Sequence, residues 1–154
     1  MLREILAEFF YTRTSELSGV ENGNYILADE TLSLVKTNNK KILVAEDDPL
    51  VRKLLNEFLT LCGYDVDCVS NGEEAIALIG ERPYDLLITD YMMPKINGIE
   101  LIQKIRNLNL SVPIIGISAS EEERGFLAAG ANLFIAMPFS PHALKNIIEE
   151  ICLT

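Results

Sequence analysis

From position 41 onward, short apolar runs alternate along this chain with longer segments that repeat apolar residues at helical spacing. The apolar runs lie at about 41–46, 64–69, 85–89, 112–118 and 133–136. Such alternation predicts parallel strands, because parallel neighbours need a long crossover connection and a helix usually supplies it. The chain is therefore expected to fold as an α/β protein, with a parallel sheet covered by helices on both faces.

Residues that begin and end helices stand where this alternation needs them. Asp48-Pro49 opens the first helix, since Asp caps free N–H groups and Pro suits the first helical position. Gly63 ends that helix, and Gly130 ends a later one. The predicted helices cover about 49–62, 73–81, 99–109, 121–129 and 141–152.

Carboxylates follow two of the apolar runs, where each run ends. Glu46-Asp47-Asp48 comes after the first run and Asp90 after the third. In an open parallel sheet, ligands bind beyond the carboxyl ends of the strands, so these side chains are expected to converge. Close carboxylates raise one another's pKa unless a cation neutralises them, and Mg2+ prefers oxygen ligands. The pattern favours a Mg2+ site over a set of helix caps, since caps do not explain acids after two separate buried strands.

Two further runs complete an ordered set of motifs. Ser118 follows the fourth run, and Met137-Pro138 follows the fifth. With the acidic residues, this set resembles the receiver domain of two-component response regulators, such as the chemotaxis receiver. That family carries an acidic pair, a phosphoacceptor Asp, a Ser or Thr and a Lys-Pro after strands one, three, four and five. The resemblance covers roughly three quarters of the chain. It implies a flavodoxin-like doubly wound five-stranded parallel sheet with strand order 2-1-3-4-5.

The resemblance also implies roles for individual residues. Asp90 would be the phosphoacceptor, attacking phosphorus to form an acyl phosphate. Asp47 and Asp90 would bind Mg2+ directly, Met92 through its backbone carbonyl, and Glu46 through water. The domain would be no enzyme in the usual sense, beyond self-catalysed phosphoryl transfer to Asp90.

Two other positions match the family but have ordinary alternatives. Ser118 would contact the phosphoryl group, yet it could equally cap the helix over 121–129, a role for which Ser120 competes. Phe134 matches the switch aromatic of the family, and plain core packing is the alternative.

Met137 is the one departure from the pattern, because the family carries a lysine there. Methionine has no charge, so phosphorylation is expected to be less efficient and the conformational switch weak or absent. This substitution keeps a second function open, an atypical pseudo-receiver that acts as a phosphorylation-independent interaction module. The resemblance also implies a cis Met137–Pro138 peptide bond.

The formal net charge of −10 argues against binding to nucleic acid or to an anionic membrane. No apolar run approaches the roughly 18 residues of a membrane span, and charged residues interrupt the first ten positions, so a cytoplasmic protein is expected. The partners implied by the resemblance are a sensor histidine kinase or histidine phosphotransfer protein and a downstream protein effector. Other enzymes fit poorly: a flavodoxin needs a Ser/Thr/Gly-rich phosphate loop after strand one, and a haloacid-dehalogenase phosphatase needs an acid where Met92 stands.

Residues 1–39 form an extension ahead of the predicted receiver domain at 40–154. Its apolar residues recur at the spacing of an amphipathic helix. They are Leu2, Ile5, Leu6, Phe9 and Phe10. Forty residues rarely fold alone, so the extension is expected to dock on the receiver, to pair with a second chain as a homodimer, or to remain partly disordered.

Overall fold

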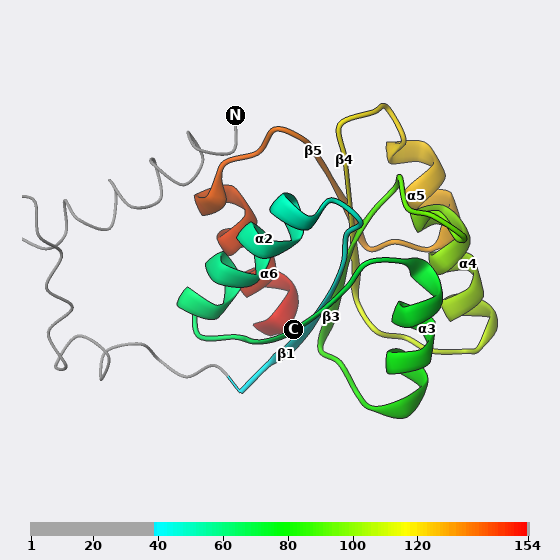
Figure 1. Cartoon of the computed structure of the whole chain (residues 1–154), viewed down its shortest axis with the longest axis horizontal. Helices are drawn as coiled ribbons and strands as arrows, with labels where there is room; N and C mark the ends of the chain where they lie inside the picture. Colours follow the sequence, from blue (N-terminus) through cyan, green and yellow to red (C-terminus); the bar gives the residue numbers. More distant parts are fainter. Residues whose placement is uncertain (1–38, 154) are drawn as a thin grey trace, which may run out of the picture.

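The computed structural model describes residues 39–153. In this part of the chain, five strands form one parallel sheet in the order β2-β1-β3-β4-β5, with helices over both faces (Figure 1). The flavodoxin-like fold and the strand order expected from the sequence are confirmed. The strands are β1 (Lys41–Ala45), β2 (Asp65–Val69), β3 (Leu86–Asp90), β4 (Ile114–Ser118) and β5 (Leu133–Ala136). The helices are α2 (Pro49–Leu61), α3 (Gly72–Glu81), α4 (Gly98–Asn107), α5 (Glu123–Ala129) and α6 (Pro141–Leu153).

Successive strand residues alternate between two hydrophobic clusters, one on each face of the sheet. In β1, Ile42 and Val44 belong to the cluster completed by residues of α2 and α6. Leu43 and Ala45 belong to the cluster completed by α3, α4 and α5. Figure 1 shows the same division, with α2 and α6 on one face of the sheet and the other three helices opposite. Because both faces of the sheet are covered, the central strands β1, β3 and β4 are apolar along most of their length, whereas the edge strand β2 carries Asp65 and Asp67.

Side-chain caps fix where two helices begin at the carboxyl edge of the sheet. The Asp48 carboxylate accepts hydrogen bonds from the N–H groups of Leu50, at 2.8 Å, and Val51, at 3.3 Å. Asn97 and Glu100 form a reciprocal capping box at the start of α4. Both caps anchor a loop that leaves a central strand at this edge.

Two boundaries differ from the expected ones near the motif residues. β3 continues through Asp90, because Asp90 pairs with Ile117 of β4. α5 begins at Glu123 and not at 121, because the N–H of Glu122 donates to the carbonyl of Ser120 at 2.9 Å and forms a turn ahead of the helix. The other element ends lie within two residues of the prediction.

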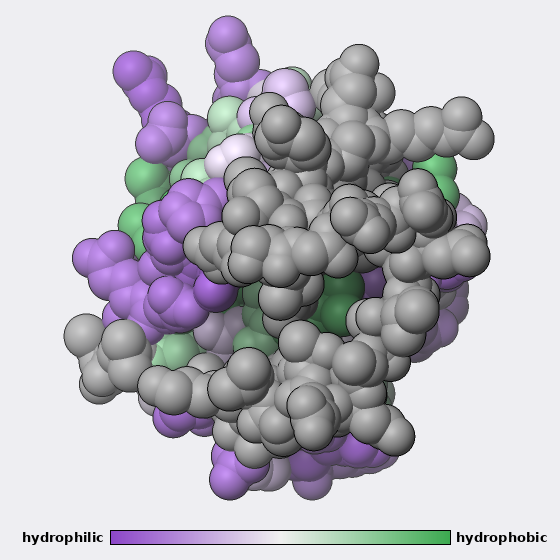
Figure 2. All heavy atoms as spheres, turned by 90° about the vertical axis from the view of Figure 1, so that its left-hand side faces the viewer, coloured by the Kyte–Doolittle hydropathy of each residue, from purple (hydrophilic) through white to green (hydrophobic). Residues whose placement is uncertain are grey.

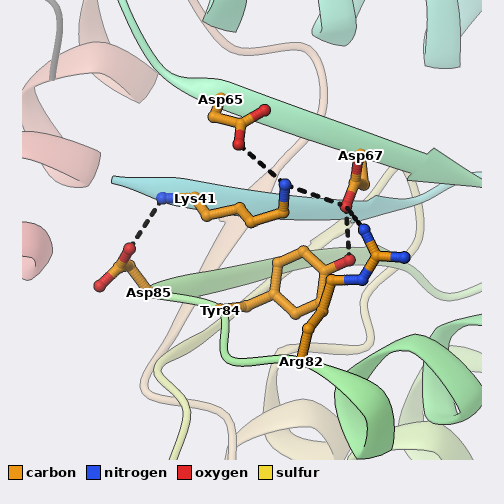
Figure 3. A network of polar contacts seen from close by, with 6 residues as sticks. All are labelled: Lys41, Asp65, Asp67, Arg82, Tyr84 and Asp85. Carbon is orange, nitrogen blue, oxygen red and sulfur yellow. Dashed lines mark hydrogen bonds and ion pairs between the residues drawn. The ribbon is translucent and has the colours of Figure 1, made fainter. Parts of the chain in front are cut away.

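A polar network joins the amino ends of β1 and β2 to the connection before β3 (Figure 3). Lys41 Nζ lies 2.8 Å from Asp65 Oδ2 and 3.4 Å from Asp67 Oδ2. The Tyr84 hydroxyl donates to Asp67 Oδ2 at 2.6 Å, and the backbone N–H of Lys41 donates to Asp85 Oδ2 at 2.7 Å. These contacts hold the edge strand β2 in place at the end of the sheet away from the acidic residues.

Hydrophilic residues occupy much of the described surface on the face shown in Figure 2, with smaller hydrophobic areas between them. Among residues 39–153, no helix has the length and apolar character needed to cross a membrane. The amphipathic helix predicted near residues 2–10 lies outside the described residues.

Candidate functional site

Three carboxylates meet beyond the carboxyl ends of β1 and β3. Glu46, Asp47 and Asp90 each offer an oxygen atom, and these three atoms lie within 4.8 Å of one another. Glu46 and Asp47 directly follow β1, and Asp90 is the last residue of β3, its neighbour in the sheet. The structure thus brings together the acids that follow two separate runs, at the switch point of the sheet.

Burial raises the pKa of two of these carboxyl groups. Glu46 is 3% exposed, and burial, reinforced by the charge of Asp90, raises its pKa to about 8, although the Asp48 N–H donates to its Oε1 at 3.0 Å. Burial, reinforced by the charge of Asp47, raises the pKa of Asp90 to about 6. Burial therefore makes the ionised form of both groups less favourable when no cation is close to them.

This donor set suits a hard divalent cation. Mg2+ takes carboxylate oxygens and keeps several waters, and Asp47 is exposed, which leaves room for water beside the cluster. A cation would also favour the ionised form of the two groups whose pKa is raised. The residues that would hold it are Glu46, Asp47 and Asp90.

The loop after β3 is held close to Asp90. The N–H groups of Tyr91 and Met92 donate to the Asp90 carboxylate, and the Gly98 N–H donates to the Tyr91 carbonyl at 2.9 Å. A Cβ atom at Gly98 would collide with the Asp90 carbonyl oxygen, so only glycine allows this close approach. Met92 is 67% exposed, and the role expected for it concerns only its backbone carbonyl.

Ser118 ends β4 and is buried, with its hydroxyl engaged by Ser120. Its Oγ accepts a hydrogen bond from the Ser120 N–H at 3.1 Å and lies 2.8 Å from the Ser120 Oγ. The helix-cap alternative for Ser118 and Ser120 is wrong, because no side chain caps the start of α5. When the Ser120 hydroxyl is the donor of this pair, the Ser118 hydroxyl keeps its own proton, which it could donate to a phosphoryl oxygen.

An aromatic cluster connects the residue after Asp90 with Phe134 on β5. Phe126 of α5 packs against Phe134 with ring centroids 5.4 Å apart, and against Tyr91 edge-on at 6.2 Å. Phe134 is half-buried, as the core-packing alternative predicts, and a switch role would require it to leave Phe126. The contact of Phe126 with Phe134 and Tyr91 was not predicted from the sequence. The only sequence feature that marks Phe126 is that it is the sole aromatic residue in the helix predicted over 121–129.

Met137 directly follows β5, next to the end of β4. Its N–H donates to the Ser118 carbonyl at 2.8 Å, and its side chain is half-buried against the cluster under α2 and α6. The Met137–Pro138 peptide bond is cis, as expected. The side chain offers the three carboxylates no positive charge.

Comparison with known proteins gives the family of this chain. The sequence profile of the response regulator receiver domain matches residues 42–149. The sensor protein EvgS of Escherichia coli is 41% identical over 114 residues, which cover 71% of this chain and 9% of that protein. The transcriptional regulatory protein ResD of Bacillus subtilis is 43% identical over 120 residues, which cover 75% of this chain and 49% of that protein.

A similar solved structure is the receiver domain of a sensor histidine kinase from Pseudomonas aeruginosa, with a magnesium ion coordinated in its active site cleft. It is 27% identical with a TM-score of 0.70, and the match covers 76% of this chain and 100% of that one. The chain spans about half or less of the length of the curated relatives it matches. Profile, sequence relatives and fold agree that this chain belongs to the response regulator receiver domain family.

Proposed function

We propose that this chain accepts a phosphoryl group on Asp90 and signals through protein–protein contacts. The donor would be the phosphohistidine of a sensor histidine kinase or of a histidine phosphotransfer protein. The observation that carries the proposal is the close approach of the Asp90 carboxylate to Glu46 and Asp47 at the switch point, with ligand oxygens within 4.8 Å.

In the proposed step, an Asp90 carboxylate oxygen attacks phosphorus while the phosphorus–nitrogen bond of the donor breaks. The imidazole leaves with the bonding electron pair, and Asp90 becomes an acyl phosphate. The N–H groups of Tyr91 and Met92 orient the carboxylate by donating to it. Ser118 would donate its hydroxyl to a phosphoryl oxygen, with the Ser120 hydroxyl as the donor between the two serines.

Bound Mg2+ would supply positive charge that offsets charge on the transferred phosphoryl oxygens. By resemblance to the receiver family, Asp47 and Asp90 would hold it directly, the Met92 carbonyl would complete the protein ligands, and Glu46 would act through water. Residues 40–154 would form the signalling unit, with 1–39 as a separate extension. The proposed location is the cytoplasm, where ATP is available to a partner kinase.

Met137 favours a second function, that of a pseudo-receiver whose contacts do not depend on phosphorylation. Its apolar side chain packs against the core, where the family has a lysine that bridges a carboxylate and the phosphoryl group. Against this alternative, the three carboxylates and Ser118 are all present at the carboxyl edge.

Electrophoresis that retards phosphoproteins separates the two functions. The full chain would be treated with acetyl phosphate, with Mg2+ or with EDTA. The phosphoacceptor proposal expects a retarded band only with Mg2+, absent in Asp90→Asn. The lack of any retarded band in the natural chain, folded and saturated with Mg2+, would support the pseudo-receiver.

A further inference from the structure

Arg52, in the first turn of α2, reaches back to the acidic loop after β1. Its Nη1 donates to the carbonyl oxygen of Glu46 at 2.8 Å and to that of Asp47 at 3.2 Å. The guanidinium therefore spans the two consecutive residues whose carboxylates form one side of the candidate metal site. No residue role expected from the sequence included this contact.

The chemistry of this contact differs from that of a cation paired with a carboxylate. Arg52 donates to backbone carbonyls, so it occupies no carboxylate oxygen of Glu46 or Asp47. When ionised, three carboxylates with oxygen atoms within 4.8 Å of one another repel and tend to spread the loops that carry them. A charged donor fixed to two carbonyls opposes that spread, and such hydrogen bonds are stronger than neutral ones.

Other contacts of the same loop show what Arg52 adds. The Glu46 N–H donates to the carbonyl of Val69, which holds the start of the loop to β2. Asp48 caps α2 and donates its N–H to Glu46 Oε1, which holds the far end. The Asp47 carbonyl lies between these anchors, and Arg52 is its donor.

We propose that Arg52 is a positioning residue for the metal site, setting the Glu46–Asp47 loop so that Mg2+ binds with its ligands preorganised. It acts from the β1 side of the site, whereas Met137 on the β5 side contributes no charge. The consequence for phosphoryl transfer rests on the proposed function, but the consequence for Mg2+ affinity does not.

Lys53 provides a matched control. It is the next residue of α2 and carries the same charge, but its Nζ lies 3.8 Å from Glu57 on the exposed side of the helix. Loss of either cation changes the net charge equally. Only loss of Arg52 removes a contact to the acidic loop.

The test is a Mg2+ titration of the full chain by NMR, following the amide signals of Asp47 and Asp48 without any phosphodonor. We expect Arg52→Gln to weaken Mg2+ binding by about 10-fold or more, as loss of an outer-shell partner does elsewhere. Lys53→Gln should stay within about twofold of the natural chain, since an exposed charge contributes little. Arg52→Lys should fall between them, because it keeps the charge on a shorter side chain that reaches the two carbonyls less well.

If Arg52→Gln and Lys53→Gln weakened Mg2+ binding equally, Arg52 would act only through its contribution to net charge, and the proposal would be overturned. An unchanged Mg2+ affinity in a folded Arg52→Gln would do the same. If Arg52→Gln fails to fold, Arg52→Lys decides, and natural affinity in that variant refutes the proposal. A natural chain that binds Mg2+ in this graded way but never accepts phosphate would refute the proposed function alone.

Discussion

Asp90→Asn should make the metal-free domain more stable, although Asp90 is the proposed reactive group. The raised pKa of Asp90, about 6 against an ordinary 3.8, means that folding disfavours its ionised form. Two pKa units correspond to about 3 kcal/mol, which solvent screening of a half-buried group reduces to about 1–2 kcal/mol. Asparagine keeps an oxygen acceptor for the Tyr91 and Met92 N–H groups but removes the charge. For a domain of this size, the gain is a rise in Tm of about 3–10 °C.

The pH dependence of this gain follows from the sign of the shift. Between its unfolded and folded pKa values, Asp90 binds more protons in the folded state, so stability falls as pH rises from about 4 to about 6. Glu46, whose pKa is raised to about 8, extends the fall further. The advantage of Asp90→Asn should therefore be larger at about pH 8 than at about pH 5.

Thermal unfolding in EDTA at about pH 5 and about pH 8 measures the stability difference between Asp90→Asn and the natural chain. Saturating Mg2+ should remove this difference, because Mg2+ stabilises the natural chain. Asp85→Asn is the control, because Asp85 accepts the Lys41 N–H at 2.7 Å at the other end of the sheet and its loss should bring no gain. The electrostatic reasoning would be refuted if Asp90→Asn were no more stable than the natural chain at about pH 8. It would also be refuted if the rise in Tm were the same at both pH values.

Three further predictions concern other parts of the chain. Gly98→Ala should destabilise the folded domain by about 2 kcal/mol and weaken Mg2+ binding, because its Cβ collides with the Asp90 carbonyl. The control Gly80→Ala, where a Cβ meets nothing within 4 Å, should stabilise the domain by about 0.5–1 kcal/mol. Equal urea midpoints for the two variants would contradict this prediction. Met137→Lys should accept phosphate faster than the natural chain at matched Mg2+, because lysine restores a charge-assisted contact; identical rates would make the substitution silent. Amide exchange over residues 2–10 should be slow, because we expect their apolar face to be buried against the receiver or a second copy of the chain; rapid exchange in a monomer would contradict this.

The sequence located the acidic site because its position depends on topology. Glu46 and Asp90 each follow or end a strand of a parallel sheet, so both lie at the same edge. The strand order then places β1 next to β3, which brings the two residues together. β3 and β4 could be placed from their apolar runs for another reason, because nearly all of their residues are buried. Burial of a whole strand leaves a pattern in the sequence, since nearly every residue in it must be apolar.

Contacts that depend on the conformation of one side chain leave no comparable pattern in the sequence, so they were not predicted. The Arg52 guanidinium bonds carbonyl groups, which every residue possesses, so no partner residue type marks the contact in the sequence. The hydrogen bond between Ser118 and Ser120 depends on the turn that delays α5, and helix ends are set by local hydrogen bonds that periodicity does not reveal. The packing of Phe126 on Phe134 requires the register of α5 against β5.

The central claim, that Asp90 accepts the phosphoryl group, is tested most directly by chemical trapping. The full chain would be treated with acetyl phosphate and Mg2+, then reduced with borohydride, which converts an aspartyl phosphate to homoserine. Peptide mass spectrometry would locate the converted residue, with EDTA-treated protein as the control. We expect homoserine at position 90 alone, and only with Mg2+. Conversion at Asp47 or Asp48 in place of Asp90, or equal conversion in EDTA, would contradict the account.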